Sequence, residues 1–412
     1  MTLIDRLGVT LLLLIPIGTL AIKKWSNSLF LLAVIVSIII LVQRRTLSLK
    51  RSPWALILVI TFSAPFLIDL LMQGLRGEIA PAQLDAPSRL LLGAPILLFC
   101  LNKKIPDLRL LTLVVGLSVV ATLVSILLDP RGVNFWGRWA TSSADPNSLG
   151  CMTAIFTGAL LYLCLTHFTS RDWLACGFAF LTLLLGIFIL LKSQSRGGWI
   201  VFVFLVTLVL ILTKKQGLRG VGWIIVSIIA LTIYIALLDD NILKRIGSIY
   251  LEYIDWLKSP QDATTSIGIR LNMVEVSWAL IKHSPILGYG DHGYAGILSF
   301  SGFAHLPPAA LIDIVNTPHN EILNKTLRSG VFGGLVALLV FLAPLIFFIK
   351  VLLHSTSSVY KTYSSVGLIL VVGFFISGMS SGILGLSYLS SFYSAAALGL
   401  AGLTMSTDNS PK

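Results

Sequence analysis

The stretch WLACGFAFLTLLLGIFILL, residues 173–191, contains nineteen residues, almost all of them apolar. It is followed by KSQSRGGW, residues 192–199, and then by fifteen further apolar residues, WIVFVFLVTLVLILT, that run from residue 199 to residue 213. An apolar run of about 17–25 residues can cross the hydrocarbon core of a bilayer as a helix. These two runs therefore predict a pair of transmembrane helices joined by a short polar turn that contains Arg196.

The composition of the whole chain is that of a membrane protein. Of its 412 residues, 56% are hydrophobic and 12% are charged, whereas about 25% of the residues of a soluble domain are charged. The apolar runs lack the alternation typical of transmembrane β-strands. We therefore expect an all-α polytopic integral membrane protein with about 12 transmembrane helices. The expected spans are 7–22, 28–42, 54–72, 89–101, 108–128, 150–167, 173–191, 199–213, 221–238, 331–350, 363–383 and 387–404.

The basic residues indicate how the spans are oriented. If the N-terminus is cytoplasmic, the cytoplasmic segments hold 15 Lys and Arg residues and the short outer loops hold eight. Because cytoplasmic loops are enriched in basic residues, we expect both termini in the cytoplasm. The same bias accounts for the net charge of +12, so we expect membrane lipids as partners and no nucleic acid.

One outer segment is long. It comprises 79 residues, Asp239 to Thr317, between the ninth and tenth spans. Residues 241–258 and 270–285 repeat apolar side chains at helical spacing and predict two amphipathic helices, which either pack on the membrane domain, lie in the interface or cover a cavity. The expected apolar positions are Ile242, Ile246, Ile249, Tyr253 and Trp256 in the first helix, and Leu271, Val274, Trp278 and Ile281 in the second.

The chain thereby divides into three parts. Residues 1–238 form the first nine transmembrane helices. Residues 239–330 form the outer helical segment and the start of the tenth helix. Residues 331–412 form the last three transmembrane helices and a cytoplasmic tail.

Arg196 is the first candidate for a functional residue. The topology places it at the outer end of the eighth span, beside Gly197 and Gly198, whose bare backbone would let a large ligand approach. A guanidinium stays charged, and its planar fork matches phosphate oxygens. The alternative is an interfacial arginine that extends to lipid headgroups.

His319 is the second candidate and lies in NTPHNEILNKTLRSG, residues 316–330. Thr317 is a suitable N-cap and Pro318 a suitable first helical residue, so we expect His319 and Asn320 in the first turn of a helix. The positive end of a helix disfavours an imidazolium, and a general base must be neutral. The alternative is a histidine that caps a helix end at the membrane surface.

Two further features lie on the outer face. Arg270 opens the second amphipathic stretch, where it can also be an ordinary solvated arginine. Arg138 and Asn147 lie in GRWATSSADPNSLG, residues 137–150, whose Asp-Pro-Asn is also a common turn signal. Taken with the two candidates above, these residues suit a substrate with a diphosphate and a lipid tail, because arginines can neutralise a leaving diphosphate.

The sequence carries no pattern for a metal or a cofactor. His283, His292 and His305 do not follow a zinc-binding spacing. The chain has no Asp-x-Asp pair, which a metal-dependent sugar transferase would use, and no Gly-x-Ser-x-Gly or Walker-type loop. The four cysteines lie in apolar runs and are expected to be core residues. We therefore expect neither a metal site nor a cofactor.

The sequence resembles the O-antigen ligase and polymerase superfamily of bacterial envelopes. Twelve spans and one large outer loop before the tenth span also resemble the ligase of that superfamily. The resemblance rests on four short motifs: Asp145-Pro146-Asn147; Ser195-Arg196-Gly197-Gly198; Arg270 with Trp278, Pro285, Gly288 and Gly290; and Pro318-His319-Asn320-Glu321 with Gly330, Gly333 and Gly334.

The resemblance implies a GT-C-like fold and a glycosyltransferase activity. Ligases of the family move a polysaccharide from undecaprenyl diphosphate to a sugar hydroxyl of lipid A–core, at the periplasmic face of the bacterial inner membrane. Their reaction is metal-independent and inverting. At the matching positions, Arg196 and Arg270 would bind the diphosphate and His319 would be the general base. The expected supporting residues are Arg138, Asn147, Asn320, Lys192 and Gln194.

Three alternatives remain open from the sequence. O-antigen polymerases and protein O-oligosaccharyltransferases belong to the same superfamily and share the histidine-asparagine motif. A transporter or flippase of an anionic lipid-linked substrate is the alternative from another class. A transporter is expected to carry charged residues deep inside its spans, and Asp69 is the nearest case in this chain.

Overall fold

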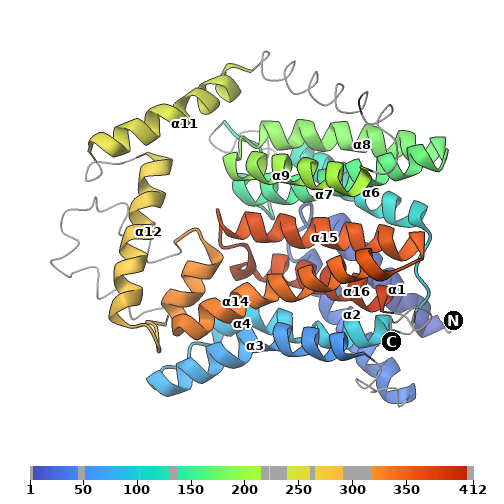
Figure 1. Ribbon diagram of the computed structural model, residues 1–412, viewed down its shortest axis with the longest axis horizontal. Helices are drawn as coiled ribbons and strands as arrows, with labels where there is room; N and C mark the ends of the chain where they lie inside the picture. The colour runs from blue at the N-terminus through green and yellow to red at the C-terminus, as the bar shows by residue number, and fades with distance from the viewer. Residues whose placement is uncertain are drawn as a thin grey trace.

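The structure is a computed structural model that describes residues 3–44, 52–101, 103–129, 137–214, 222, 239–259, 265–290 and 318–405. These residues form a bundle of helices, with α12 set across one end of it and α11 running out beyond the same end (Figure 1). The helices are α1 (Leu3–Gly18), α2 (Trp25–Arg44), α3 (Pro53–Arg76), α4 (Pro81–Leu91), α5 (Ala94–Cys100), α6 (Leu108–Leu128), α7 (Pro146–Thr169), α8 (Trp173–Lys192), α9 (Arg196–Thr213), α11 (Asp240–Lys258), α12 (Ser266–His283), α14 (Glu321–His354), α15 (Ser358–Gly378), the 3-10 helix η5 (Ile383–Gly385) and α16 (Ser387–Thr404).

The multi-pass helical class predicted from the sequence is confirmed for the part of the chain that is described. Eight of these helices are long and apolar enough to cross a membrane: α2, α3, α6, α7, α8, α9, α14 and α15. Helix α6 has the predicted bounds of the fifth span, and α8 differs from the seventh by one residue. Apart from residue 222, the ninth span predicted at 221–238 lies outside the described residues.

The fourth predicted span, 89–101, is two short helices instead of one. Helices α4 and α5 are separated at Leu92 and Gly93. A Cβ atom on Gly93 would lie 2.0 Å from Ser394 Oγ and 2.7 Å from Leu398 Cδ1, both on α16. The chain therefore bends where α16 comes close to its backbone, and the span prediction, which used only length and hydropathy, could not detect this contact.

Helix α7 lies at the centre of the bundle and packs against α8, α9 and α15. Within its apolar window 94% of the residues are buried. Small residues allow this close packing, as is common between membrane helices. A Cβ atom on Gly186 of α8 would lie 2.5 Å from Thr157 Oγ1 of α7.

The bundle has a network of charges at the end that holds the start of α1. Asp5 is buried there and forms ion pairs with Arg44 and Lys103. At the same end, Arg109 donates to Asp172 at 2.7 Å. The sequence assigned these basic residues to the cytoplasm, and that orientation stays a prediction.

The two amphipathic stretches form α11 and α12, but their buried faces differ from those predicted. On α12, Ile281 is buried as predicted, but Val274 and Trp278 are exposed, and the rest of the buried stripe is Met273, Val276 and Leu280. This stripe packs on Leu327 of α14, so contact with α14 selects the buried face of α12. On α11, only Ile242 of the predicted apolar positions is buried.

A kink in α14 joins this helix to the segment that follows α12. Gly330 interrupts the helix with φ 65° and ψ −168°. Val331 N donates to Pro285 O at 2.7 Å, and Tyr289 N donates to Leu327 O at 2.7 Å. A Cβ atom on Gly330 would lie 1.9 Å from Ile286 O, so this position requires glycine. The motif that contains Arg270 and Pro285 therefore contacts the motif that contains His319 and Gly330.

Candidate functional site

Four arginines from four segments gather at the end of the bundle opposite to Asp5. They are Arg138 before α7, Arg196 at the start of α9, Arg245 on α11 and Arg270 on α12. Burial lowers the pKa of Arg138 to about 10, and the charges of the other three arginines contribute to the shift. The structure thus brings the three predicted arginines together and adds Arg245.

Arg138 is oriented by two of the predicted supporting residues. Its Nε donates to Ser193 O at 2.9 Å, and its Nη2 donates to Asn147 Oδ1 at 2.9 Å. Gln194 Nε2 donates to Gly137 O at 3.1 Å. Asn147 and Gln194 therefore hold the loop that carries Arg138.

Arg196 is held by α11. Its two terminal nitrogens donate to the two carboxylate oxygens of Glu252 at 2.8 and 2.6 Å, and Nη2 also donates to Ser248 Oγ at 2.5 Å. This is the bidentate geometry in which arginine also binds phosphate. The Arg196 guanidinium holds the pKa of Glu252 below its usual value. A phosphate that binds Arg196 must therefore compete with Glu252.

Two more contacts fix α11 to the turn between α8 and α9. Arg245 Nε donates to Gln194 O at 2.9 Å. Lys192 Nζ donates to Asp239 Oδ2 at 2.8 Å, and Asp239 is the N-cap of α11. Lys192, a predicted supporting residue, therefore anchors α11.

The glycines beside Arg196 serve helix packing, in contrast to the expectation that they leave room for a ligand. A Cβ atom on Gly197 would lie 2.7 Å from Ser380 Oγ. One on Gly198 would lie 2.6 Å from the carbonyl carbon of Gly150. The first turn of α9 packs so closely on α7 and on the chain after α15 that only glycine fits.

Arg270 differs from the other members of the cluster. It lies in the first turns of α12, and burial lowers its pKa. Among the residues that the structure describes, no hydrogen bond or ion pair joins its guanidinium to another side chain or to the backbone. Its donors are therefore available to an anion.

His319 lies just before α14 rather than in its first turn. The N-cap is Asn320, whose Oδ1 accepts from Leu323 N at 3.0 Å, and the helix begins at Glu321. The predicted cap, Thr317, lies outside the described residues. Asparagine caps helices at least as well as threonine, and His319 adopts a left-handed φ of 50° ahead of this cap. The imidazole is partly exposed.

The end of α15 connects the histidine turn with the arginine turn. Asn320 Nδ2 donates to Met379 O at 3.4 Å. The next residue, Ser380, lies against Gly197. Met379 therefore contacts the residue next to His319, and Ser380 lies against the residue next to Arg196. Both motifs thus approach the same part of the bundle.

Sequence reasoning missed Arg245 and Glu252, although their spacing carried a signal. Arg245, Ser248 and Glu252 recur at i, i+3 and i+7, which places them on one face of α11. It also missed the partners of Asp69, which accepts from Lys325 Nζ and from Ser329 Oγ, each at 2.6 Å. Asp69 is therefore neutralised by a structural ion pair between α3 and α14.

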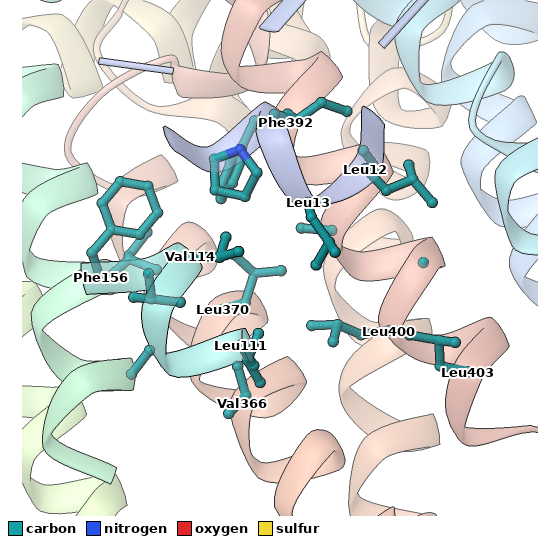
Figure 2. A pocket seen from close by; sticks show the side chains of 18 of the residues that line it. Leu12, Leu13, Leu111, Val114, Phe156, Val366, Leu370, Phe392, Leu400 and Leu403 are labelled. Atoms are coloured by element: carbon teal, nitrogen blue, oxygen red, sulfur yellow. The ribbon is translucent and has the colours of Figure 1, made fainter. Parts of the chain in front are cut away.

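No metal site is formed by the described residues, since no three His, Cys, Asp or Glu side chains among them lie close enough to share an ion. An apolar cavity of about 130 Å³ lies inside the bundle (Figure 2). Its lining includes Leu13, Val114, Phe156, Leu370 and Phe392 and none of the candidate residues. It can hold hydrocarbon but offers no group for catalysis.

The fold and the site define a class: a multi-pass helical membrane protein with a cationic cluster and a histidine at one end. Residues 179–338 match the family model described as O-Antigen ligase. The match supports the resemblance seen in the motifs, and this region of the chain is similar to the O-antigen ligase family.

A relative from Haemophilus influenzae, described as an uncharacterized protein, is 25% identical over 271 residues. The aligned region covers 65% of this chain and 66% of that protein. The matched family region contains Arg196, Arg245, Arg270 and His319, whereas Arg138 lies before it.

Proposed function

We propose that the protein transfers an O-antigen polysaccharide from undecaprenyl diphosphate to a sugar hydroxyl of lipid A–core. The reaction would take place at the periplasmic face of the bacterial inner membrane. The observation that supports this most is the arginine cluster, three of whose four members lie in the matched family region. Such a cluster of positive charges fits the negative charge of a lipid diphosphate, which is the substrate that the resemblance implies.

In this proposal Arg270 makes the first contact with the diphosphate, because its donors have no partner among the described residues. Arg196 is the second contact. The diphosphate of the donor carries about two negative charges, one on each phosphate, whereas the Glu252 carboxylate carries one, so the diphosphate can replace Glu252 on the Arg196 fork. Arg138 and Arg245 add positive potential, and together the arginines stabilise the leaving diphosphate as a metal ion would.

His319 acts as the general base. Its imidazole takes the proton of the acceptor hydroxyl while the acceptor oxygen attacks the anomeric carbon and the bond to the diphosphate breaks. One displacement of this kind inverts the configuration and needs no covalent glycosyl-enzyme. Asn320 positions the histidine by capping α14 and by its contact with Met379 O.

The test is a transfer assay with purified protein, undecaprenyl-diphosphate-linked glycan and lipid A–core, with chelator present and without ATP. We expect glycan on the core, and we expect His319→Ala to lower the rate by about 10²–10⁴. His354→Ala is the matched control, because His354 lies in the last turn of the helix that follows His319.

Four results would contradict the proposal. Elongation of the glycan on its carrier would identify a polymerase. Transfer to a protein acceptor in place of lipid A–core would identify an oligosaccharyltransferase. Movement of the intact donor across the bilayer without transfer would identify a flippase. Full activity of His319→Ala would remove the base from the mechanism.

A further inference from the structure

Helix α12, which carries Arg270, lies across the end of the bundle (Figure 1). In the described part of the chain its main packing partners are α11 and α14. Its second half is fixed on α14, because Val276 and Leu280 pack on Leu327. Arg270 precedes this contact, so the position of its guanidinium depends on what holds the first turns of α12.

The first turns of α12 are held by the last turns of α11. Trp256 Nε1 donates to Asn272 Oδ1 at 3.0 Å. Asn272 is fully buried and lies two residues after Arg270. One turn earlier on α11, Glu252 Oε2 accepts from Ile267 N at 3.4 Å. In Figure 1 the end of α11 accordingly lies beside the start of α12.

The other end of α11 is fixed to the turn between α8 and α9, which carries Arg196. Asp239, the N-cap of α11, pairs with Lys192 at 2.8 Å. Arg245 Nε donates to Gln194 O at 2.9 Å. Neither contact involves the Arg196 side chain, so both remain in place when a diphosphate binds to that side chain.

Helix α11 thus connects the two arginines that would bind the donor. The pKa of Arg270 is lowered first by burial, and the charges that act on it include those of Arg196 and Glu252, so the two guanidinium groups share one environment. Groups that are held in place by a rigid helix form a more precise binding site than groups on loops. They also lower the cost of ordering the site when a ligand binds.

We propose that α11 sets the separation of Arg196 and Arg270, and that Trp256 is the residue that positions Arg270. The inference rests on the proposed function, because it requires that the two arginines share one diphosphate. A diphosphate presents two phosphates at a fixed spacing, so it binds both arginines well only while their separation is fixed. The single phosphate of undecaprenyl phosphate can bind to either arginine alone, so its affinity does not depend on that separation.

The test variant is Trp256→Phe, which keeps an aromatic ring and removes the N–H group that donates to Asn272. The matched control is Tyr253→Phe, which also removes one polar group from a ring on α11. Tyr253 stacks on Trp256 with the ring centroids 6.3 Å apart, and phenylalanine keeps this stacking. The affinities of undecaprenyl diphosphate and of undecaprenyl phosphate are measured for the purified full chain.

We expect Trp256→Phe to weaken the binding of undecaprenyl diphosphate by about two- to tenfold, the effect of one hydrogen bond. The affinity for undecaprenyl phosphate should not change, and Tyr253→Phe should bind both lipids normally. In a chain that already carries Arg270→Gln, Trp256→Phe should cause no further loss. A residue that only stabilises the fold would weaken the binding of both lipids equally and would add its effect to that of Arg270→Gln.

A second measurement needs no lipid ligand. Spin labels on Thr207→Cys of α9 and Ser266→Cys of α12 report the distance between the two helices, since both positions are exposed and the four native cysteines are buried. We expect the distribution of this distance to broaden in Trp256→Phe and to stay narrow in Tyr253→Phe. An unchanged distribution in Trp256→Phe would overturn the proposal.

The two measurements separate this inference from the proposed function. If Arg270→Gln weakens the binding of undecaprenyl diphosphate and Trp256→Phe does not, the positioning role is wrong while the proposed function stands. If Trp256→Phe broadens the distance but the unmodified chain does not bind undecaprenyl diphosphate, the positioning role is supported and the proposed donor is wrong.

Discussion

The contact at Gly330 provides a quantitative test of how the two helices of the site are held together. Replacing Gly330 with alanine puts a side chain on a residue at φ 65° and ψ −168°, a conformation that costs a non-glycine residue about 1–3 kcal/mol. The new Cβ atom would also lie 1.9 Å from Ile286 O and 2.8 Å from Pro285 O. Relieving such an overlap typically costs about 1–3 kcal/mol.

Together these costs predict that Gly330→Ala loses roughly 2–6 kcal/mol of a total stability of about 5–15 kcal/mol. Thermal unfolding in detergent measures the loss as a lower Tm. Gly177→Ala is the matched control, because no atom other than the neighbouring backbone of α8 itself lies within 4 Å of its Cβ position. In a helix this change is expected to be neutral or to stabilise by up to about 1 kcal/mol. The reasoning is refuted if Gly330→Ala melts at the same temperature as Gly177→Ala.

Two further predictions concern ion pairs. Asp69→Ala leaves Lys325 buried without its partner and is expected to cost about 3–5 kcal/mol, which the same melting assay detects; an unchanged Tm would contradict the role of this pair. Arg196 and Lys192 hold the pKa values of Glu252 and Asp239 below their ordinary values of about 4. These pairs therefore stabilise the docking of α11 above that range and lose their effect as the pH falls through the folded values. A spin label on α11 should become mobile only at such acid pH, and Glu252→Gln should reduce this pH dependence; mobility that changes near pH 7 would contradict the assignment.

The spans were predictable where length and hydropathy suffice. Helices α6 and α8 follow directly from uninterrupted apolar runs. The break between α4 and α5 was not predictable, because it depends on how closely Ser394 approaches Gly93 across about 300 residues of sequence.

The candidate site was predictable in its charges but not in its contacts. Arg196 and Arg270 were identified from their motifs, and the structure places them in one cluster. The pairing of Arg196 with Glu252 joins residues 56 positions apart, and no local pattern specifies that partner. The start of α14 was ambiguous for a different reason, because both Thr317 and Asn320 are good capping residues and only the surrounding structure selects between them.

The central claim is that the arginine cluster binds a lipid diphosphate through Arg270. The most direct measurement is the affinity of undecaprenyl diphosphate for the purified protein and for Arg270→Gln, with Lys361→Gln at the other end of the bundle as the control. Since Arg270 has no hydrogen bond or ion pair within the described residues, its removal should leave the Tm unchanged. The account predicts that Arg270→Gln weakens binding at least about tenfold, the loss of one charged hydrogen bond, while the control binds normally. An Arg270→Gln protein that folds and binds undecaprenyl diphosphate as tightly as the control would contradict it.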